Sequence, residues 1–493
     1  MRLETHDAVH AAGPGFMPSF SLHTFELSDA PPFDALSYTW GDPRCPLVDH
    51  PLTVDYYGPT HPTLCDGHIF PARKNLHDAL KRLGQSPVFE TLNRVRAKYL
   101  WVDAICINQD DIQERNAQVL QMGDLYRRAA SVIAWLGEED ELITQQSLGI
   151  LHQLSLFGFI PRSWGEVRQI REDICSWITP QDFHDDEGYR EKLGAERPGV
   201  REWLAFASFL QLSFFRRAWI VQEVTLAKDI TMVWGERVFD FDDVARTAWF
   251  LAATGWAEFL LPGYFKRYLI GTSAGPFSKL VQSKKSPLLS LLPLVQTRCQ
   301  ANYTTPIFQS MPDLLRVHRP CEATDPRDRV FAFLGIANKR FGYFTDSEKA
   351  IFFMPDYNRP LVNLYTVITR LFVMESGNLR TLINRGSRVL VKSSLAETLP
   401  SWVPDYTVAV IPDPLHVGGT WNWSANGSHV WRPDHLPIDE LFLGVQGVEI
   451  GEISETSIPY AGPEAGISIH QRWASMAPLL QGLRQFYNPM PQQ

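Results

Sequence analysis

The hydrophobic positions along this chain mark out a set of short strands. Residues 33–43, FDALSYTWGDP, alternate and then break at Gly-Asp-Pro, which predicts a short strand and a sharp turn. Residues 98–107, KYLWVDAICI, and residues 130–137, ASVIAWLG, are nearly continuous apolar runs with β-branched and aromatic residues. Such runs are typical of strands that are buried on both faces. Residues 229–235, DITMVWG, predict a fourth strand.

Helical periodicity occupies much of the rest of the chain. A helix over residues 73–84 is expected to end at Gly84 as its C-cap. Asp110 and Asp111 are expected to cap a longer helix. The buried side of that helix is marked by Ile112, Val119, Met122 and Tyr126. Further helices are predicted within residues 201–212, 216–228, 241–261, 311–339 and 361–375.

The order strand, helix, strand, helix, strand predicts an α/β fold with a doubly wound, mostly parallel sheet. We expect this unit to occupy residues 20–240, after an N-terminal tail at 1–19. An insertion is expected over about 157–200, where the sequence has no clean period. A mainly helical region over 241–410 and a Pro- and Gly-rich segment over 411–493 follow.

Composition and charge narrow the class of protein. A length of 493 residues, with 45% hydrophobic and 20% charged residues, is typical of a globular protein of roughly two or three units. The net charge of −9 argues against a nucleic-acid or anionic-membrane surface. Without a signal peptide or an apolar run long enough to span a membrane, we expect a cytoplasmic protein. The cysteines and histidines form no metal-binding spacing, so we assign no metal.

Three blocks of the sequence resemble, in order and spacing, the signature blocks of the fungal heterokaryon-incompatibility (HET) domain. They are residues 33–43, residues 100–137 and the segment FFRRAWIVQEV at 214–224. Residues 323–337 and 399–406 resemble segments that usually follow this domain. The resemblance implies a role in nonself recognition, where incompatible hyphal fusion triggers programmed cell death. It also implies a protein partner, either a second copy of the chain or an incompatibility partner.

The HET domain is itself remotely similar to Toll/interleukin-1 receptor (TIR) domains, which implies a flavodoxin-like sheet. In TIR domains a first strand ends in a Ser-aromatic pair, which DALSYTWGD matches, and a later helix carries Trp-Cys-x-x-Glu. Here Trp219 and Glu223 keep the outer positions, and Ile220 departs from the pattern by replacing the Cys. In TIR enzymes this Glu is the catalytic residue of NAD⁺ cleavage. The resemblance therefore implies Glu223 as the catalytic residue and NAD⁺ as a substrate, with no cofactor.

The chemistry of Glu223 has two interpretations. On a helix, Trp219 and Glu223 share a face, so an aromatic ring would stand beside a carboxylate. A carboxylate near a ribose can stabilise the oxocarbenium-like state of glycosidic bond cleavage. In the alternative, Glu223 pairs with Arg216 or Arg217 and anchors its helix to a loop. The apolar residues on both sides disfavour a plain surface charge.

The loop after the first predicted strand is a candidate ligand-binding site, because doubly wound sheets bind ligands at the carboxyl ends of their strands. Ser37, Trp40, Gly41 and Asp42 would line its rim. Gly41 permits a turn that other residues resist. The alternative is a plain Gly-Asp turn with Trp40 in the core.

A second candidate loop follows the strand predicted over 98–107. Asp103 is expected inside that buried strand, where a carboxylate needs a partner. Asn108 and Gln109 follow the strand and could hydrogen-bond a ribose or a base. In the alternative, Asp103 bonds backbone amides near Trp40.

These observations leave two main functions open. One is an NAD⁺ hydrolase that kills the cell by depleting NAD⁺. The other is a non-enzymatic module that assembles with itself or a partner and acts by recruitment. A HET-type protein in some other process is a third. The hydrolase requires Glu223 to share a cleft with Ser37, Trp40 and Asn108.

Overall fold

The computed structural model describes residues 2–3, 17–50, 54–85, 97–265, 274–283, 285–303, 310–337, 354–376, 395 and 398–408. All of them belong to one compact unit, Met1–Val445. The segment predicted over 411–493 and most of the predicted tail at 1–19 lie outside the described residues.

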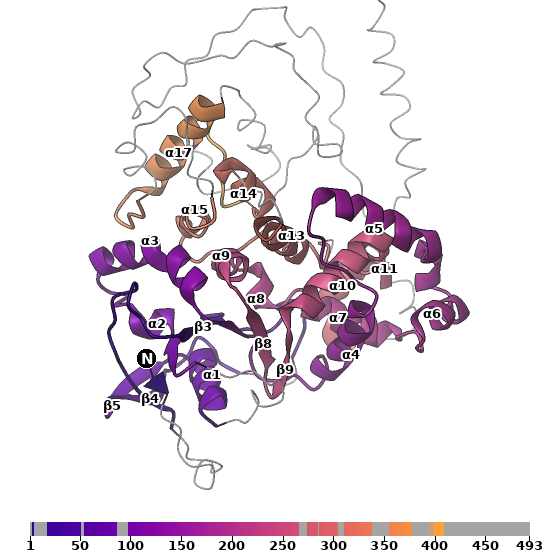
Figure 1. Cartoon of the computed structure of the whole chain (residues 1–493), viewed down its shortest axis with the longest axis horizontal. Coiled ribbons are helices and arrows are strands. Elements are labelled where there is room, and N and C mark those ends of the chain that lie inside the picture. The colour runs from indigo at the N-terminus through magenta and orange to yellow at the C-terminus, as the bar shows by residue number, and fades with distance from the viewer. Residues whose placement is uncertain are drawn as a thin grey trace, which may run out of the picture. The chain divides into compact units, whose positions relative to one another are not determined.

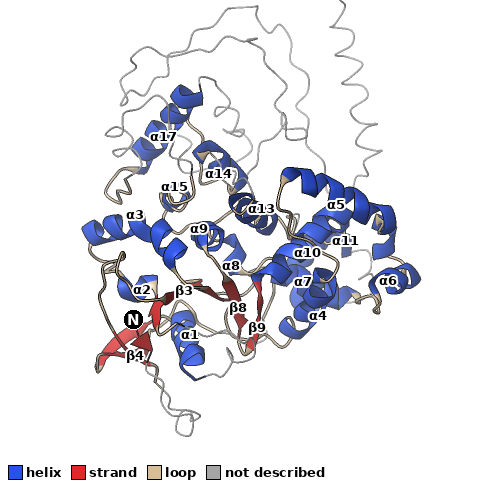
Figure 2. Ribbon diagram, viewed as in Figure 1, coloured by secondary structure: helices blue, strands red, loops and turns tan. Residues whose placement is uncertain are grey.

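The main sheet has five strands in the order β6-β3-β7-β8-β9. Its strands β3, β8 and β9 are labelled in Figures 1 and 2. β3 pairs in parallel with β6 and β7, and β7 pairs in parallel with β8. Across the sheet, the four parallel strands are β6, β3, β7 and β8. In chain order these are the second, first, third and fourth of the four. The last strand, β9, is antiparallel to β8 and was not predicted. The bounds are β3 (Phe33–Tyr38), β6 (Tyr99–Trp101), β7 (Val132–Trp135), β8 (Ile230–Trp234) and β9 (Arg237–Asp240).

Helices cover both faces of this sheet. Along β3, Ala35 belongs to the apolar cluster shared with α3 (Ile112–Arg128) and α9 (Ala218–Leu226). The next residue, Leu36, belongs to the cluster on the other face, where α1 (Lys74–Gln85) packs. Alternate residues of a strand point to opposite faces, so a strand covered on both sides is apolar throughout. The expected α/β class is confirmed.

A smaller sheet has the strand order β1-β2-β4-β5. Its strands are β1 (Arg2–Leu3), β2 (Ser19–Ser21), β4 (His61–Cys65) and β5 (His68–Ala72). The last two form an antiparallel hairpin, and Phe20 of β2 packs into the cluster on the α1 side of the main sheet. This sheet therefore extends the cover over one face of the main sheet.

The remaining helices follow and interrupt the α/β core. Three elements lie within residues 157–200, where an insertion was expected. They are α5 (Trp164–Trp177), η2 (Pro180–Phe183) and α6 (Asp186–Leu193). Because η2 and α6 are short and the turns between the three elements are polar, the sequence shows no clean period there. Before β8 come α2 (Asp103–Cys106), α4 (Thr144–Ser155), α7 (Val200–Phe209) and α8 (Ser213–Arg216). After β9 come α10 (Phe241–Thr254), η3 (Trp256–Glu258), α11 (Pro262–Phe265), η5 (Gly275–Phe277), α12 (Ser278–Gln282), α13 (Leu291–Ala301), α14 (Met311–Val317), α15 (Asp328–Phe331) and α17 (Leu361–Ser376).

Three local predictions were wrong. The strand expected over 98–107 stops at Trp101, and Asp103 begins the short helix α2 instead. Gly84 lies within α1, which continues to Gln85, so it is not a C-cap there. Ile112 is exposed because it is the first residue of α3, whose N-cap is Asp111. The predicted buried positions Val119, Met122 and Tyr126 are confirmed.

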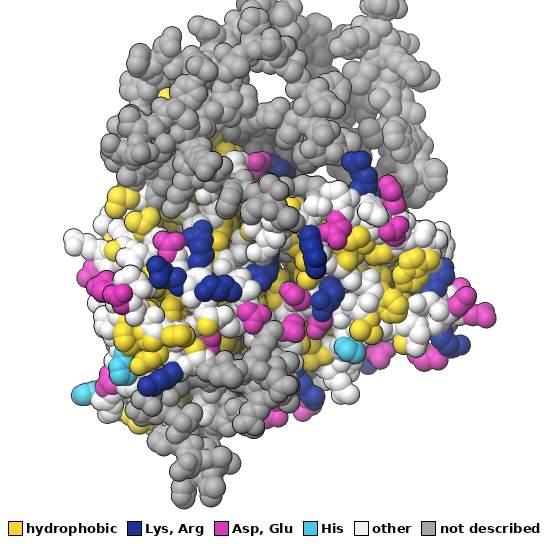
Figure 3. Space-filling view, viewed as in Figure 1, with side chains coloured by type: hydrophobic (Ala, Val, Ile, Leu, Met, Phe, Trp, Pro, Cys, Tyr) yellow, Lys and Arg dark blue, Asp and Glu magenta, His cyan; other side chains and the backbone are white. Residues whose placement is uncertain are grey.

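Surface charge is mixed rather than segregated. Figure 3 shows acidic and basic side chains spread among apolar ones on one face of the described molecule. This mixture fits a net charge of only −9 on 493 residues. Within the part of the chain that the structure describes, no helix has the length and apolar character needed to cross a membrane.

The carboxyl ends of β3 and β7 are joined by one buried amide. The Asn75 side chain, 1% exposed, donates to the Thr39 carbonyl at 2.7 Å and accepts from Nε1 of Trp135 at 2.8 Å. Removing it leaves a buried donor and a buried acceptor without partners. We expect Asn75→Ala to lower the free energy of unfolding by about 2–4 kcal/mol in urea titrations. Asn302→Ala, at an exposed helix end, is the control and should cost less than about 1 kcal/mol.

Candidate active site

A buried carboxylate, Glu223, lies in a polar cluster inside the core. Glu223 is 3% exposed, although its neighbours in α9, Ile220, Val221 and Val224, are apolar core residues. An ionised carboxylate is costly to bury without hydrogen-bond donors and positive charge. The surrounding side chains supply both.

Two hydroxyl groups hold the Glu223 carboxyl group. Ser37 Oγ, at the carboxyl end of β3, donates to Glu223 Oε2. The Tyr126 side chain, on the buried face of α3, also hydrogen-bonds the carboxyl group. Ser37 and Tyr126 are each 1% exposed. Three elements that are distant in the sequence therefore meet at one carboxyl group.

The positive charge near Glu223 comes from Arg217, the N-cap residue of α9. Its guanidinium donates to the backbone carbonyl of Tyr38. Arg216 instead pairs with the carboxylate of Glu322. The interpretation in which Arg216 pairs with Glu223 is therefore wrong, and Arg217 is the cation close to Glu223.

A second carboxylate stands beside the first. Asp103, at the start of α2, accepts from Nε1 of Trp40 at 2.8 Å and from its neighbouring Ala104 amide at 2.7 Å. The Tyr38 hydroxyl also hydrogen-bonds it. Gln109 Nε2 donates to the Asp103 backbone carbonyl at 3.1 Å. We call Ser37, Tyr38, Asp103, Tyr126, Arg217 and Glu223 the carboxylate cluster.

Desolvation dominates the acidity of both carboxyl groups. Burial raises the pKa of Glu223 to about 7, against the lowering effects of Arg217 and the Ser37 hydrogen bond; the charge of Asp103 adds to the rise. Burial also raises the pKa of Asp103, and Arg217 and Trp40 oppose the rise. Glu223 can therefore exist in both protonation states near neutral pH, as a catalytic acid or base requires.

Some predicted site residues lie apart from the cluster. Asp42 forms an ion pair with Arg44, which holds the loop after β3 in place. Gly41 has no positive φ, and a Cβ there would meet only the ring of Tyr57, an exposed side chain that can move aside, so the predicted need for a glycine turn is not seen. The backbone amide of Asn108 donates to Glu114 at the start of α3, and no contact brings Asn108 to Glu223.

Trp219, four residues before Glu223, bonds a different carboxyl group. Its side chain hydrogen-bonds the Asp328 carboxylate of α15, and desolvation raises the pKa of that carboxyl. Although the two residues lie four positions apart on α9, Glu223 bonds Ser37 and Tyr126, whereas Trp219 bonds Asp328. Trp219 therefore links α9 to the region after residue 300.

Tyr38, Tyr126 and Arg217 are the three cluster members that were not predicted as residues of a ligand site. The sequence marks Tyr126 only as a residue on the apolar side of a helix, and its hydroxyl gives no periodic signal. Arg217 was anticipated as an ion-pair partner of Glu223. Within the described residues, no group of three or more His, Cys, Asp or Glu side chains is placed to hold a metal ion.

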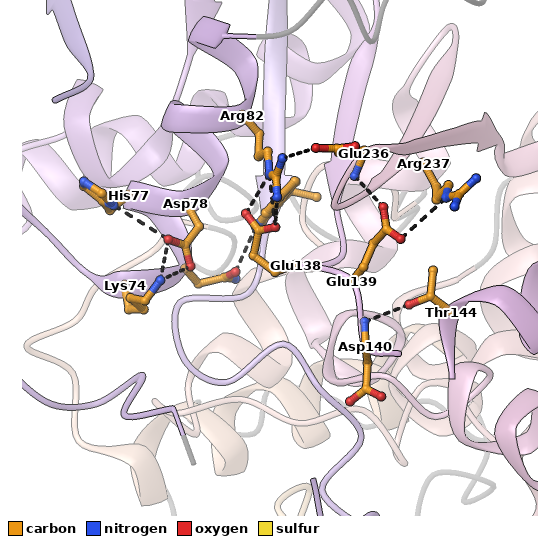
Figure 4. A network of polar contacts seen from close by, with 12 residues as sticks. Lys74, His77, Asp78, Arg82, Glu138, Glu139, Asp140, Thr144, Glu236 and Arg237 are labelled. Atoms are coloured by element: carbon orange, nitrogen blue, oxygen red, sulfur yellow. Dashed lines mark hydrogen bonds and ion pairs between the residues drawn. The ribbon is translucent and has the colours of Figure 1, made fainter. Parts of the chain in front are cut away.

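Ion pairs secure the loops at the same edge of the sheet (Figure 4). Arg82 of α1 binds Glu138, in the loop after β7, at 2.6 Å and Glu236, in the β8–β9 turn, at 2.7 Å. Glu139 accepts from the Glu236 amide at 3.0 Å. These partly exposed pairs tie three connections together and contribute modestly to stability.

The fold and the cluster define an α/β protein with a carboxyl group buried beside the carboxyl end of β3, the first strand of its main sheet in chain order. Residues 33–223 match the family model described as heterokaryon incompatibility protein (HET), from the first residue of β3 to Glu223 itself. Over these residues the chain is similar to the heterokaryon incompatibility family.

One curated relative extends the similarity beyond that segment. The chain is 26% identical over 497 residues to heterokaryon incompatibility protein 6, OR allele, of Neurospora crassa. The similarity covers 94% of this chain but only 65% of that protein's length. No solved structure matches the chain.

The raised pKa of Glu223 makes a prediction about stability. A carboxyl group whose pKa rises from 4.5 when unfolded to about 7 when folded takes up a proton on folding. Its stabilising contribution is complete below pH 4.5 and is lost as pH rises through about 7. Relative to Glu223→Gln, the wild-type chain should lose up to about 3 kcal/mol of unfolding free energy over that interval.

Urea titrations at a series of pH values measure this difference. Gln keeps the shape and retains one acceptor oxygen, but it cannot ionise. Glu191→Gln, at an exposed position of α6, is the matched control and should track the wild type at every pH. A parallel pH dependence in all three proteins would show that Glu223 ionises normally.

Proposed function

We propose that this protein acts in fungal nonself recognition and programmed cell death, and that its HET domain cleaves NAD⁺ with Glu223 as the catalytic residue. The proposal rests on one observation. Ser37 and Glu223 lie 186 residues apart in the chain, and their side chains are hydrogen-bonded at the carboxyl end of β3. The TIR resemblance implies that these two positions share an active site.

The order of the parallel strands supports the proposal. An order of second, first, third, fourth is that of flavodoxin-like sheets, in which ligands bind outside the carboxyl ends of the strands where the order reverses. β3 is the strand at that reversal, and Ser37 lies near its carboxyl end. We therefore propose a TIR-like fold for the HET domain.

The chemistry of NAD⁺ hydrolysis suits a carboxyl group with this acidity. The nicotinamide–ribose bond breaks and its electron pair leaves with nicotinamide, so positive charge develops on the ribose. An ionised Glu223 stabilises that charge and accepts the proton of the attacking water. The products are nicotinamide, ADP-ribose and one proton. NAD⁺ is thus a substrate, and we place the reaction in the cytoplasm.

A specific observation favours a second function. Glu223 and Ser37 are 3% and 1% exposed, so the carboxylate cluster also suits a structural anchor inside a signalling module. In that case the protein assembles with a second copy or a partner, and death follows from recruitment. The relative named above is a heterokaryon incompatibility protein, which is consistent with either mechanism.

An experiment in living yeast distinguishes the two functions. The full chain is expressed as wild type, Glu223→Gln and Glu191→Gln, and growth and cellular NAD⁺ are followed together. The hydrolase predicts that the wild type and the Glu191 variant lower NAD⁺ and growth. Glu223→Gln should reduce the NAD⁺ loss by about a hundredfold or more, because it removes the group that stabilises the transition state.

The variant must fold for this comparison to be valid. Thermal unfolding of the purified Glu223→Gln chain checks this, and we expect it to be at least as stable as the wild type at neutral pH. Growth inhibition that persists in Glu223→Gln with NAD⁺ intact would establish the assembly function instead.

A further inference from the structure

The helix that carries Glu223 is held by residues that lie beyond the matched HET segment. At its N-terminal end, the Ala218 amide donates to the Glu322 carbonyl at 2.9 Å. At its C-terminal end, Arg298 Nη1 donates to the carbonyls of Val224 at 2.6 Å and Ala227 at 2.8 Å. These contacts satisfy backbone groups that the helix itself leaves without partners. Both ends of α9 are therefore fixed from outside residues 33–223.

Gly335 joins the two helices that contribute to the carboxylate cluster. Its amide donates to Gln222 Oε1 at 2.8 Å, and its carbonyl accepts from the Arg127 guanidinium. Gln222 is the residue before Glu223, and Arg127 is the residue after Tyr126. Gly335 thus bonds α9 and α3 next to the two side chains that share a hydrogen bond.

Only glycine fits at this position. A Cβ on Gly335 would overlap the Gln222 side-chain oxygen and would stand 2.9 Å from Cα of Gly123 in α3. A Cβ on Gly123 would stand 2.8 Å from Cα of Gly335. The two backbones are therefore in direct contact, and any added atom must separate Gly335 from α3 or α9.

A second set of contacts links the same helices a short way along the chain. The Asp328 carboxylate accepts from the Tyr357 hydroxyl at 2.5 Å and bonds the Trp219 side chain of α9. The Arg115 guanidinium of α3 lies 3.7 Å from the centre of the Tyr357 ring. Trp219 and Arg115 are thus bridged by residues from two later segments.

This arrangement closes the carboxylate cluster. Glu223, Ser37 and Tyr126 are each at most 3% exposed, so no substrate reaches the carboxyl group in this state. The closed state also carries a cost, since Gln222 Nε2 is buried with no hydrogen-bond partner among the described residues. Because one buried donor of α9 has no partner within the described part of the closed state, the loss of the contacts from Gly335 and Asp328 would favour the opening of α9.

We propose that Gly335, with Gln222 and Arg127, is the latch of a clamp that keeps Glu223 closed against Ser37 and Tyr126. The clamp consists of the residues that make these contacts: Arg298, Glu322, Asp328, Gly335 and Tyr357. Its release lets α9 move away from α3 and admits the substrate. The inference rests on the proposed NAD⁺ hydrolase function and assigns its resting state to contacts outside the matched HET segment.

The test measures α9 and the reaction separately in the purified full chain. Gly335→Ala separates the latch, and Tyr357→Phe weakens the second contact while keeping the ring over Arg115. Gly149→Ala is the matched control, because Gly149 is an exposed helical glycine with open space where its Cβ would be. Hydrogen exchange of the amides of residues 218–226 reports opening, and loss of added NAD⁺ reports chemistry.

The clamp predicts that both rates rise together in Gly335→Ala, by about tenfold, because each is proportional to the open fraction. Tyr357→Phe should raise both by a smaller factor, and Gly149→Ala should change neither. Adding Glu223→Gln to Gly335→Ala should abolish the NAD⁺ loss and leave the faster exchange. Tyr357→Phe keeps the test valid if Gly335→Ala does not fold.

The possible failures are distinguishable. Unchanged exchange of α9 in both variants would overturn the clamp. Faster exchange with slower NAD⁺ loss would also overturn it, because Gly335 would then support activity rather than restrain it. NAD⁺ loss that ignores Glu223 in every background, or no NAD⁺ loss at all despite faster exchange, would overturn the proposed hydrolase function instead.

Discussion

The structure depends on keeping one carboxyl group out of water. Glu223 can occupy an apolar helix only because Ser37 and Tyr126 bring hydroxyl groups to it and Arg217 brings positive charge. Those residues come from β3, α3 and the loop before α9, so satisfying one buried acid fixes the relative positions of three elements. A misplacement of any of them would leave a buried charge without partners, which costs far more than a lost apolar contact. The buried cluster is therefore satisfied only when β3, α3 and α9 are packed in their correct relative positions.

The same constraint extends past the matched HET segment. α9 cannot hold Glu223 in place alone, because its end groups are satisfied by Glu322 and Arg298 and its side chains by Gly335 and Asp328. The predicted boundary at residue 240 stays a prediction. The contacts nonetheless show that residues on either side of it share one set of hydrogen bonds.

How far the sequence predicted this structure depended on the type of signal. Continuous apolar runs located β7 and β8, and the apolar period located α3 and its buried side, because burial on one or two faces leaves a pattern. The short helix at Asp103 was missed, since four residues are too few to show a period. For the site, the meeting of Ser37 and Glu223 was predicted from resemblance, whereas Asn108, expected in the same cleft, bonds Glu114 instead. Tyr126 and Gly335 were not predicted, because a buried hydroxyl and a close backbone contact depend on neighbours that are distant in the chain.

The end of the matched segment at Glu223 has a consequence for how such domains can be exchanged between genes. A chain cut there would lose β8, four of whose five residues pair with β7 in parallel. All four residues of β7 are buried, so the cut would expose an apolar strand with open hydrogen-bonding groups, which favours aggregation. Recombination that preserves solubility must therefore carry β8 and its covering helices along with the signature blocks. The folded unit is therefore larger than the segment that the family model matches.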